Sequence, residues 1–119
     1  LYIYNFWATW CKPGVKQLPY SNLADSGWAG KPVKFLLISL DFSENVEDVL
    51  IPFMIEHEIR PEVIVLDDPD ANSWIPEIDP SWEGAIPATL FFRMKQRKFM
   101  NQTFTFEELN TEIENFLNP

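Results

Sequence analysis

Apolar positions along the chain alternate between short continuous runs and stripes with helical spacing. The continuous runs are rich in β-branched and aromatic residues, which predicts strands over 1–7, 33–40, 62–66, 88–93 and 98–104. Stretches with apolar residues three or four positions apart predict helices between these strands and after the last one. The resulting order, β-α-β-α-β-α-β-β-α, describes an α/β sandwich in which crossover helices join parallel strands and a hairpin closes the sheet.

Prolines and small polar residues predict where the helices begin. Pro13 suits a first helical turn, because the N–H that proline lacks would have no partner there. Ser43 or Asn45 is a suitable N-cap for the second helix. Pro52 should bend or interrupt that helix, since it removes one backbone hydrogen bond.

The end of the chain predicts a hairpin followed by an amphipathic helix. Lys95-Gln96-Arg97 should form the turn between the last two strands. Thr105 or Thr103 is a suitable cap for the helix. One face of that helix collects apolar side chains, namely Phe106, Leu109, Ile113, Phe116 and Leu117.

Length and charge limit the classes of function. The chain has 119 residues, which is enough for one domain with a substantial core. The net charge of −9 argues against nucleic acid and against docking on anionic lipid, since both would repel this surface. No apolar run approaches the length of about 20 residues that a membrane span needs. The sequence opens at Leu1, already within a predicted strand, so a signal peptide, lipid anchor or leading hairpin would lie upstream of it.

Cys11 is the only cysteine, and it lies at the junction between the first predicted strand and the first predicted helix. A single cysteine excludes an internal disulfide and a multi-thiol metal site, and we expect neither a metal nor a cofactor. A free cysteine is commonly a small buried apolar residue. At a helix N-terminus, however, unpaired N–H groups and the helix dipole favour a thiolate, so we expect Cys11 to be exposed and reactive.

Two motifs carry a resemblance to a known family. The stretch Asn5-Phe6-Trp7-Ala8-Thr9-Trp10-Cys11-x-Pro13 resembles the active-site segment of thioredoxin-fold proteins, and in particular of the TlpA/ResA-like thiol–disulfide oxidoreductases. The second motif is Gly84-Ala85-Ile86-Pro87-Ala88-Thr89, where the family places a cis-proline opposite the active-site cysteine. The resemblance implies that Cys11 is the attacking nucleophile and that the Ile86–Pro87 peptide bond is cis.

The resemblance also implies a complete fold. We expect one thioredoxin-like domain over 1–119, a three-layer α/β/α sandwich with a mixed five-stranded sheet. The strand order should be 62–66, 33–40, 1–7, 88–93, 98–104, with the last two antiparallel. The helix and strand at about 45–66 correspond to the central α-β insertion of TlpA-like proteins, and the N-terminal part of the family domain is absent from the sequence.

Two positions depart from the family pattern. The family motif is Trp-Cys-x-Pro-Cys, but Gly14 stands in the place of the second, resolving cysteine. Many ResA-like proteins carry a glutamate three residues further on, and this chain has Gln17. Without a second thiol, a mixed disulfide on Cys11 should persist until an outside thiol releases it.

The function implied is that of a single-cysteine thiol–disulfide oxidoreductase with a Cys-x-x-Gly site. Its partners would be proteins or small molecules with a thiol or disulfide, in an extracytoplasmic compartment such as the bacterial periplasm or envelope. Trp10 should shield the thiol and line a substrate groove. The other residues expected to contact substrate are Lys12, Pro13, Ile86 and Pro87.

Two alternatives remain open at this point. The chain is either a redox enzyme or a binding module that keeps the groove around Trp10 and Pro87 without redox work. Gly14 would also be found in an engineered trap of a dithiol enzyme, which the natural gene would reveal at codon 14. The specific partner, the direction of electron flow and the oligomeric state are not determined by the sequence.

Overall fold

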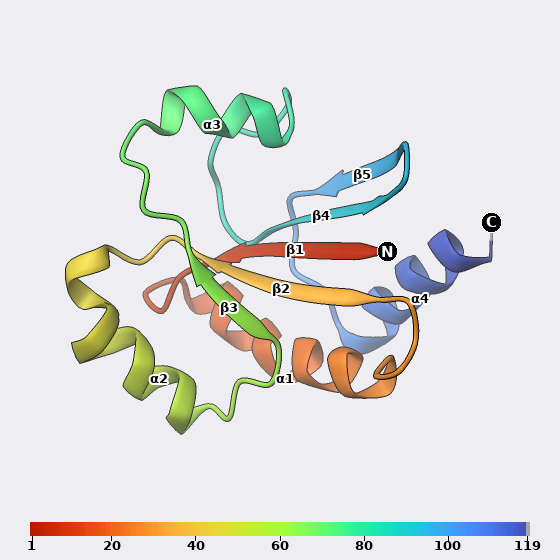
Figure 1. Ribbon diagram of the computed structural model, residues 1–119, viewed down its shortest axis with the longest axis horizontal. Helices are drawn as coiled ribbons and strands as arrows, with labels where there is room; N and C mark the ends of the chain where they lie inside the picture. Colours follow the sequence, from red (N-terminus) through yellow and green to blue (C-terminus); the bar gives the residue numbers. More distant parts are fainter. Residues whose placement is uncertain (119) are drawn as a thin grey trace.

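A mixed five-stranded sheet forms the middle layer of the computed structural model, which describes residues 1–118 (Figure 1). The strand order is β3-β2-β1-β4-β5, as predicted. β1 runs parallel to β2, and β2 parallel to β3, whereas β4 is antiparallel to both β1 and β5. The strands are β1 (Tyr2–Trp7), β2 (Lys34–Ser39), β3 (Glu62–Val65), β4 (Ala88–Arg93) and β5 (Gln96–Met100).

Helices cover both faces of this sheet. Figure 1 shows α1, α2 and α4 on one side and the short α3 on the other, so the fold is the predicted three-layer α/β/α sandwich. The α-helices are α1 (Lys12–Gly27), α2 (Ile51–Glu56), α3 (Ala71–Ile78) and α4 (Phe106–Leu117). Two short helical segments precede α2, the 3₁₀ turn η1 (Ser43–Asn45) and the π-helical η2 (Val46–Leu50).

The alternation of side chains along β1 explains how the two faces are filled. Ile3 is fully buried in a core beneath α1 and α4, whereas Phe6 points to the opposite face. The core beneath α1 and α4 contains Ile3, Ala24, Phe35, Phe91, Phe104, Leu109 and Ile113. On the other face, residues of α3 and the loop after it pack on the sheet, where Trp82 contacts Phe6 and Trp74.

The interrupted helix at Pro52 is confirmed. The chain forms η2 up to Leu50, and the regular α2 begins at Ile51, with Pro52 in its first turn. Proline is tolerated there because its missing N–H needs no helical partner. The expected N-caps are wrong: neither Ser43 nor Asn45 makes a side-chain capping bond, because the segment enters through the tight η1 turn.

The closing hairpin differs from the prediction in its turn and its length. The turn consists of Met94 and Lys95, since Arg93 already pairs with Gln96. Met94 adopts a positive φ of 56°, a conformation that tight two-residue hairpins require. β5 ends at Met100 rather than at 104, because the partner strand begins at Ala88 and is preceded by Pro87, which has no N–H to donate.

The last helix begins as predicted. Thr105 accepts a hydrogen bond from the Glu108 N–H, and the Glu108 side chain accepts one from the Thr105 N–H, which is a complete capping box. Leu109 and Ile113 are fully buried on the face that meets the sheet.

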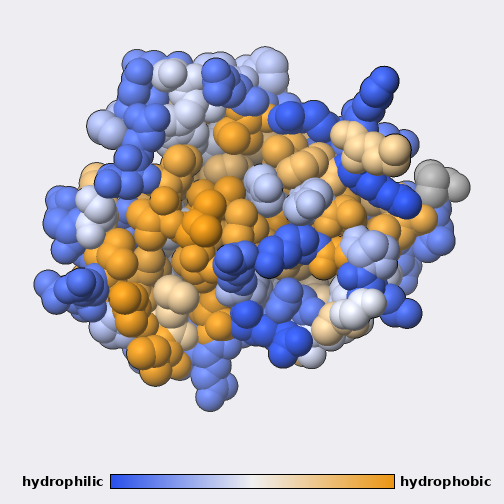
Figure 2. Space-filling model, viewed as in Figure 1, coloured by the Kyte–Doolittle hydropathy of each residue, from blue (hydrophilic) through white to orange (hydrophobic). Residues whose placement is uncertain are grey.

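The surface seen in Figure 2 carries an apolar area over α2 and β3. The exposed apolar residues of these two elements include Ile51 and Ile55 of α2 and Ile64 of β3. None of the helices within residues 1–118 has the length and apolar character needed to cross a membrane.

Candidate active site

Cys11 lies at the junction between β1 and α1, where the sequence places it. β1 ends at Trp7, and after Ala8, Thr9 and Trp10 the cysteine occupies the N-cap position of α1 with extended backbone angles. Its N–H donates to the Ala8 carbonyl (3.0 Å), and its own carbonyl accepts from Val15 N–H (2.9 Å) as the helix begins. Pro13 stands in the first turn, as expected.

The Cys11 thiol faces the loop that leads into β4. Cys11 Sγ lies 3.4 Å from the Ile86 carbonyl oxygen, to which the thiol donates a hydrogen bond. The Ile86–Pro87 peptide bond is cis, in agreement with the expectation, and Pro87 itself is buried. The fold therefore brings Cys11 to Ile86 and Pro87, although Ile86 lies 75 positions after Cys11 in the sequence.

The thiol is far less exposed than its place at a helix N-terminus predicts. Cys11 exposes only 7% of its surface, whereas its neighbour Trp10 exposes 60%. The Trp10 indole is therefore available for contact with another molecule. Its exposure does not support the expectation that the ring packs over the thiol and shields it. The neighbouring Lys12 and Pro13 are also exposed, and Ile86 is half-buried.

The backbone at Gly14 keeps the spacing of a disulfide. A Cβ atom placed on Gly14 would lie 3.7 Å from Cys11 Cβ and 3.4 Å from Cys11 Sγ. Cβ–Cβ distances in disulfides are about 3.5–4.5 Å. The same atom would be 3.5 Å from Trp7 Cβ, an ordinary contact. The backbone at position 14 therefore has a Cβ–Cβ spacing to Cys11 that a disulfide could bridge.

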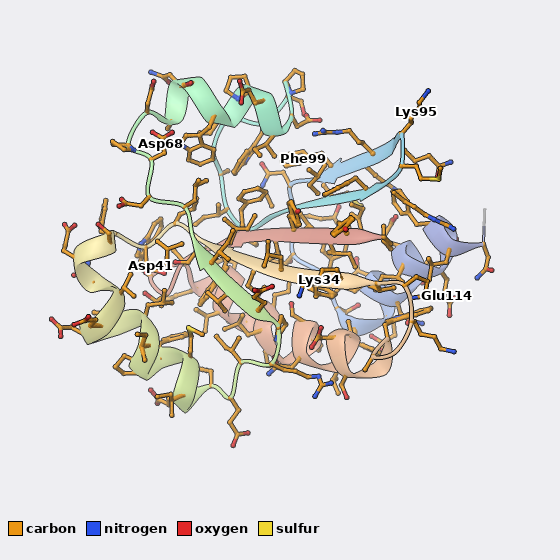
Figure 3. All side chains as sticks on the ribbon, viewed as in Figure 1. Lys34, Asp41, Asp68, Lys95, Phe99 and Glu114 are labelled. Atoms are coloured by element: carbon orange, nitrogen blue, oxygen red, sulfur yellow. The ribbon has the colours of Figure 1, made fainter. Side chains whose placement is uncertain are left out.

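Asp41, which the sequence reading did not single out, holds the loop before Cys11. It follows β2, at the end of the sheet where β1 also ends (Figure 3). Its carboxylate accepts hydrogen bonds from the Thr9 N–H (3.2 and 3.3 Å to its two oxygens) and from the Thr9 hydroxyl (2.6 Å). Ser39 donates a further bond of 2.6 Å. This buried network fixes the loop, and with it the start of α1.

Gln17 is buried beneath α1 and exposes 2% of its surface. Its side-chain oxygen accepts a hydrogen bond from the Phe104 N–H (3.0 Å). This bond ties α1 to the segment between β5 and α4. The amide nitrogen of Gln17 has no hydrogen-bond partner among the described residues.

Within residues 1–118, no group of three or more His, Cys, Asp or Glu side chains has an arrangement that could hold a metal ion.

Comparison with known proteins gives a partial match in sequence and a full match in fold. No protein-family model matches the chain. The thiol-disulfide oxidoreductase ResA of Oceanobacillus iheyensis is 36% identical over 64 residues, which is 50% of this chain. The match spans 33% of that protein, about a third of its length.

Two solved structures illustrate the likeness in fold. A thioredoxin-related protein from Neisseria meningitidis serogroup B superposes with a TM-score of 0.84 at 19% identity, covering 99% of this chain and 85% of that one. A secreted disulfide oxidoreductase of Mycobacterium tuberculosis gives a TM-score of 0.72 at 18% identity, covering 96% of this chain and 80% of that one.

The strand order, the placement of Cys11 against the residue before a cis-proline and the partial match to ResA agree with one another. The chain has the thioredoxin fold, and over half of its length it is similar to the thiol-disulfide oxidoreductase ResA.

Proposed function

We propose that this chain acts as a thiol–disulfide oxidoreductase that uses Cys11 as its only redox group. The observation that carries the proposal is the position of Cys11 Sγ, at the N-terminus of α1 and 3.4 Å from the Ile86 carbonyl beside cis-Pro87. A thiol at a helix N-terminus is favoured as a nucleophile, because the helix end stabilises negative charge. The partial likeness to ResA supports the same activity.

The reaction follows from the presence of one thiol. The Cys11 thiolate attacks one sulfur of a partner disulfide and forms a mixed disulfide, while the other partner sulfur leaves as a thiolate and takes up a proton. In a two-cysteine site, the second thiolate then attacks Cys11 Sγ and releases the partner. Gly14 supplies no sulfur, so an external thiol must carry out this second exchange.

The partner would bind along the residues around the thiol. The backbone at Ile86 and Pro87 precedes β4 and offers a short ledge on which an extended peptide can pair. Exposed Trp10 would add apolar contact, and Lys12 and Pro13 would border the same approach to the thiol. The partner is therefore a protein or small molecule that presents a disulfide or thiol in an accessible, extended segment.

We place this activity outside the cytoplasm. The structural relative from Mycobacterium tuberculosis is described as secreted, and disulfide exchange on protein partners suits an oxidising compartment.

The test is the intact mass of the protein after incubation with a disulfide-containing protein. One covalent adduct per chain should form in the wild type and should persist until a small thiol is added. A Cys11→Ser variant should form none. Complete reduction of the substrate without an adduct and without added thiol would overturn the proposal.

A second function is supported by the burial of the thiol. Because Cys11 exposes 7% of its surface beside a Trp10 that exposes 60%, the surface around Trp10 also suits a binding module without redox work. In that case a Cys11→Ala variant would bind its partner as tightly as the wild type. A large loss of binding in Cys11→Ala would exclude this second function.

A further inference from the structure

β3 is an edge strand whose outer side presents free backbone groups. Within residues 1–118 it pairs only with β2. The Leu66 N–H donates to the Ser39 carbonyl of β2 (2.9 Å), so Leu66 and, two residues earlier, Ile64 turn their backbone groups toward β2. Val63 and Val65 therefore direct their N–H and C=O groups to the open edge, where no other segment of the described chain pairs with them. Such an edge is a template for another strand.

The two edges of the sheet differ in how they are protected against such pairing. β5, at the opposite edge, carries Arg97 and Lys98, and charged side chains keep strand edges apart. The middle of β3 instead carries Ile64, which exposes 43% of its surface. The one charged residue of β3, Glu62, forms an ion pair with Lys34 of β2 (2.9 Å). The middle of β3 therefore lacks the charges that would keep a second strand away.

Apolar surface continues from this edge onto α2. Figure 2 shows it over β3 and α2, and Ile55 of α2 exposes 73% of its surface. Ile51, one turn earlier, exposes 44%. Removing such surface from water favours association. A partner that pairs with β3 would lie beside this apolar area.

The charges at the two ends of β3 identify the partner as a second copy of this chain. Arg60 precedes the strand, and Asp67 and Asp68 follow it. When two identical edges pair antiparallel, the cationic end of each lies beside the acidic end of the other. Arg60 is available for this contact, because half of its side chain (50%) is exposed although its Nε lies 3.0 Å from Asp25. The edge is thus complementary to itself in charge.

The free backbone groups define the register of this pairing. With Val63 opposite Val65 of the second copy, each pair exchanges both of its N–H···O=C bonds. Ile64 then faces Ile64 of the second copy across the two-fold axis, with Cα atoms about 4.5 Å apart. Continued outward, the same register places Arg60 opposite Asp68. An axis perpendicular to the sheet also keeps the two α2 helices on the same face.

We propose that two copies of this chain associate through antiparallel pairing of their β3 edges and so join their sheets into one. The net charge of −9 on each copy opposes association. At physiological ionic strength, however, exposed charges more than about 8 Å apart are largely screened. The contacts at the edge are direct and keep their attraction.

The first test combines sedimentation with hydrogen exchange, in a reducing buffer of physiological ionic strength that prevents a disulfide between two Cys11 thiols. As the concentration rises from micromolar to millimolar, the mass should change from that of one chain to that of two. The amide protons of Val63 and Val65 should become protected in parallel, whereas those of Ile64 and Leu66 should be protected throughout. A chain that stays monomeric, or a dimer in which Val63 and Val65 exchange freely, would overturn the proposal.

A variant at the axis tests the position of the interface. Ile64→Lys places two ammonium groups opposite each other and should weaken the dimer at least about tenfold. Met94→Lys is the matched control, because Met94 exposes 94% of its surface in the turn between β4 and β5. It should leave the dimer unchanged. Equal weakening by both changes would contradict an interface at β3.

A charge exchange tests the antiparallel direction. Arg60→Asp should weaken the dimer about tenfold, because two attractive contacts with Asp68 become repulsive. Adding Asp68→Arg to the same chain should restore the affinity. A double variant that associates no better than Arg60→Asp alone would show that the edges do not pair in this direction and would overturn the proposal.

Discussion

Among individual residues, Asp41 holds the loop that leads from β1 to the thiol. Its buried carboxylate receives both the N–H and the hydroxyl of Thr9, two residues before Cys11, and also the hydroxyl of Ser39. Hydrogen bonds to a charged group contribute about 1.5–3 kcal/mol to stability. The network therefore stabilises the loop before Cys11, and the loop in turn fixes the position of Cys11.

Replacing Asp41 by alanine should loosen this loop. We expect the free energy of unfolding to fall by about 2–3 kcal/mol, because Thr9 and Ser39 lose a charged acceptor while Ser39 stays buried. Urea denaturation measures this loss. Labelling of Cys11 by a thiol reagent should become faster than in the wild type, because wild-type Cys11 exposes only 7% of its surface and a looser loop would expose more.

Asp41→Asn is the matched comparison, since it keeps the shape of the side chain and an acceptor oxygen, and its loss should be smaller. A loss below about 0.5 kcal/mol in Asp41→Ala, the usual range for surface changes, together with unchanged labelling, would contradict this role.

The residues of the site were predictable to different degrees. Cys11, Gly14 and Pro87 were identified because they belong to local motifs. The burial of Cys11 was not, because it depends on the Ile86 carbonyl, 75 positions away. Asp41 gave no signal, since an aspartate after a strand is also typical of a simple turn, and its partner Thr9 lies 32 positions earlier.

Among the elements, α4 depends on the capping box at its first turn. Thr105→Ala should lower the free energy of unfolding by about 1 kcal/mol, because one orphan N–H at the helix start loses its acceptor. Urea denaturation again provides the measurement.

Thr111→Ala is the matched control for this prediction. Thr111 lies exposed within α4 and bonds only to the Glu107 carbonyl of its own helix. Alanine has the higher helix propensity, so this change should be neutral or slightly stabilising. Equal effects of the two substitutions would contradict the capping account.

The ends of helices were predictable where one residue restricts the local backbone or caps the helix. Pro52 sets the start of the regular α2, and Thr105 the start of α4. The hairpin turn was misplaced because it contains no glycine or asparagine, and Met94 takes the positive φ instead. The end of β5 depends on its partner strand rather than on its own residues.

At the scale of the whole molecule, one core joins the sheet to the helices that carry the site. Phe91 of β4 is fully buried and contacts both Phe104 and Phe116. Phe104 in turn supplies the N–H that holds Gln17 beneath α1. The packing of β4 and the position of α1 are therefore linked.

Phe91→Ala should lower the free energy of unfolding by about 3–5 kcal/mol, because it removes buried aromatic surface and leaves a cavity. Phe42→Ala is the control, since Phe42 exposes 63% of its surface, and it should change stability by no more than about 0.5 kcal/mol. Chemical denaturation of the two variants measures both effects. A loss of less than about 1 kcal/mol in Phe91→Ala would contradict its place in the core.

The overall arrangement was predictable because local patterns and the family resemblance agree. Apolar runs at 33–40 and 62–66 indicated parallel strands, and the resemblance supplied their order. β3 is an edge strand of the sheet and contains no fully buried residue, contrary to the burial that its apolar run suggests. The burial of Gln17 beneath α1 was not predictable, because its side chain bonds to the Phe104 N–H, 87 positions away.

The most direct test of the central claim is to restore the missing sulfur. The claim is that Cys11 is the nucleophile of an intact thioredoxin-type site that lacks only its second thiol. In Gly14→Cys, the new Cβ would lie 3.7 Å from Cys11 Cβ, within the range of disulfides. Gly14→Ser, which adds a similar side chain without sulfur, is the matched control.

The measurement is reduction of a protein disulfide without added small thiol, followed by intact mass. Gly14→Cys should release the reduced substrate and end with an internal disulfide between Cys11 and the introduced cysteine. The wild type and Gly14→Ser should stop at a mixed disulfide. If a folded Gly14→Cys protein forms no internal disulfide, or stops at the same adduct as the wild type, the central claim is wrong.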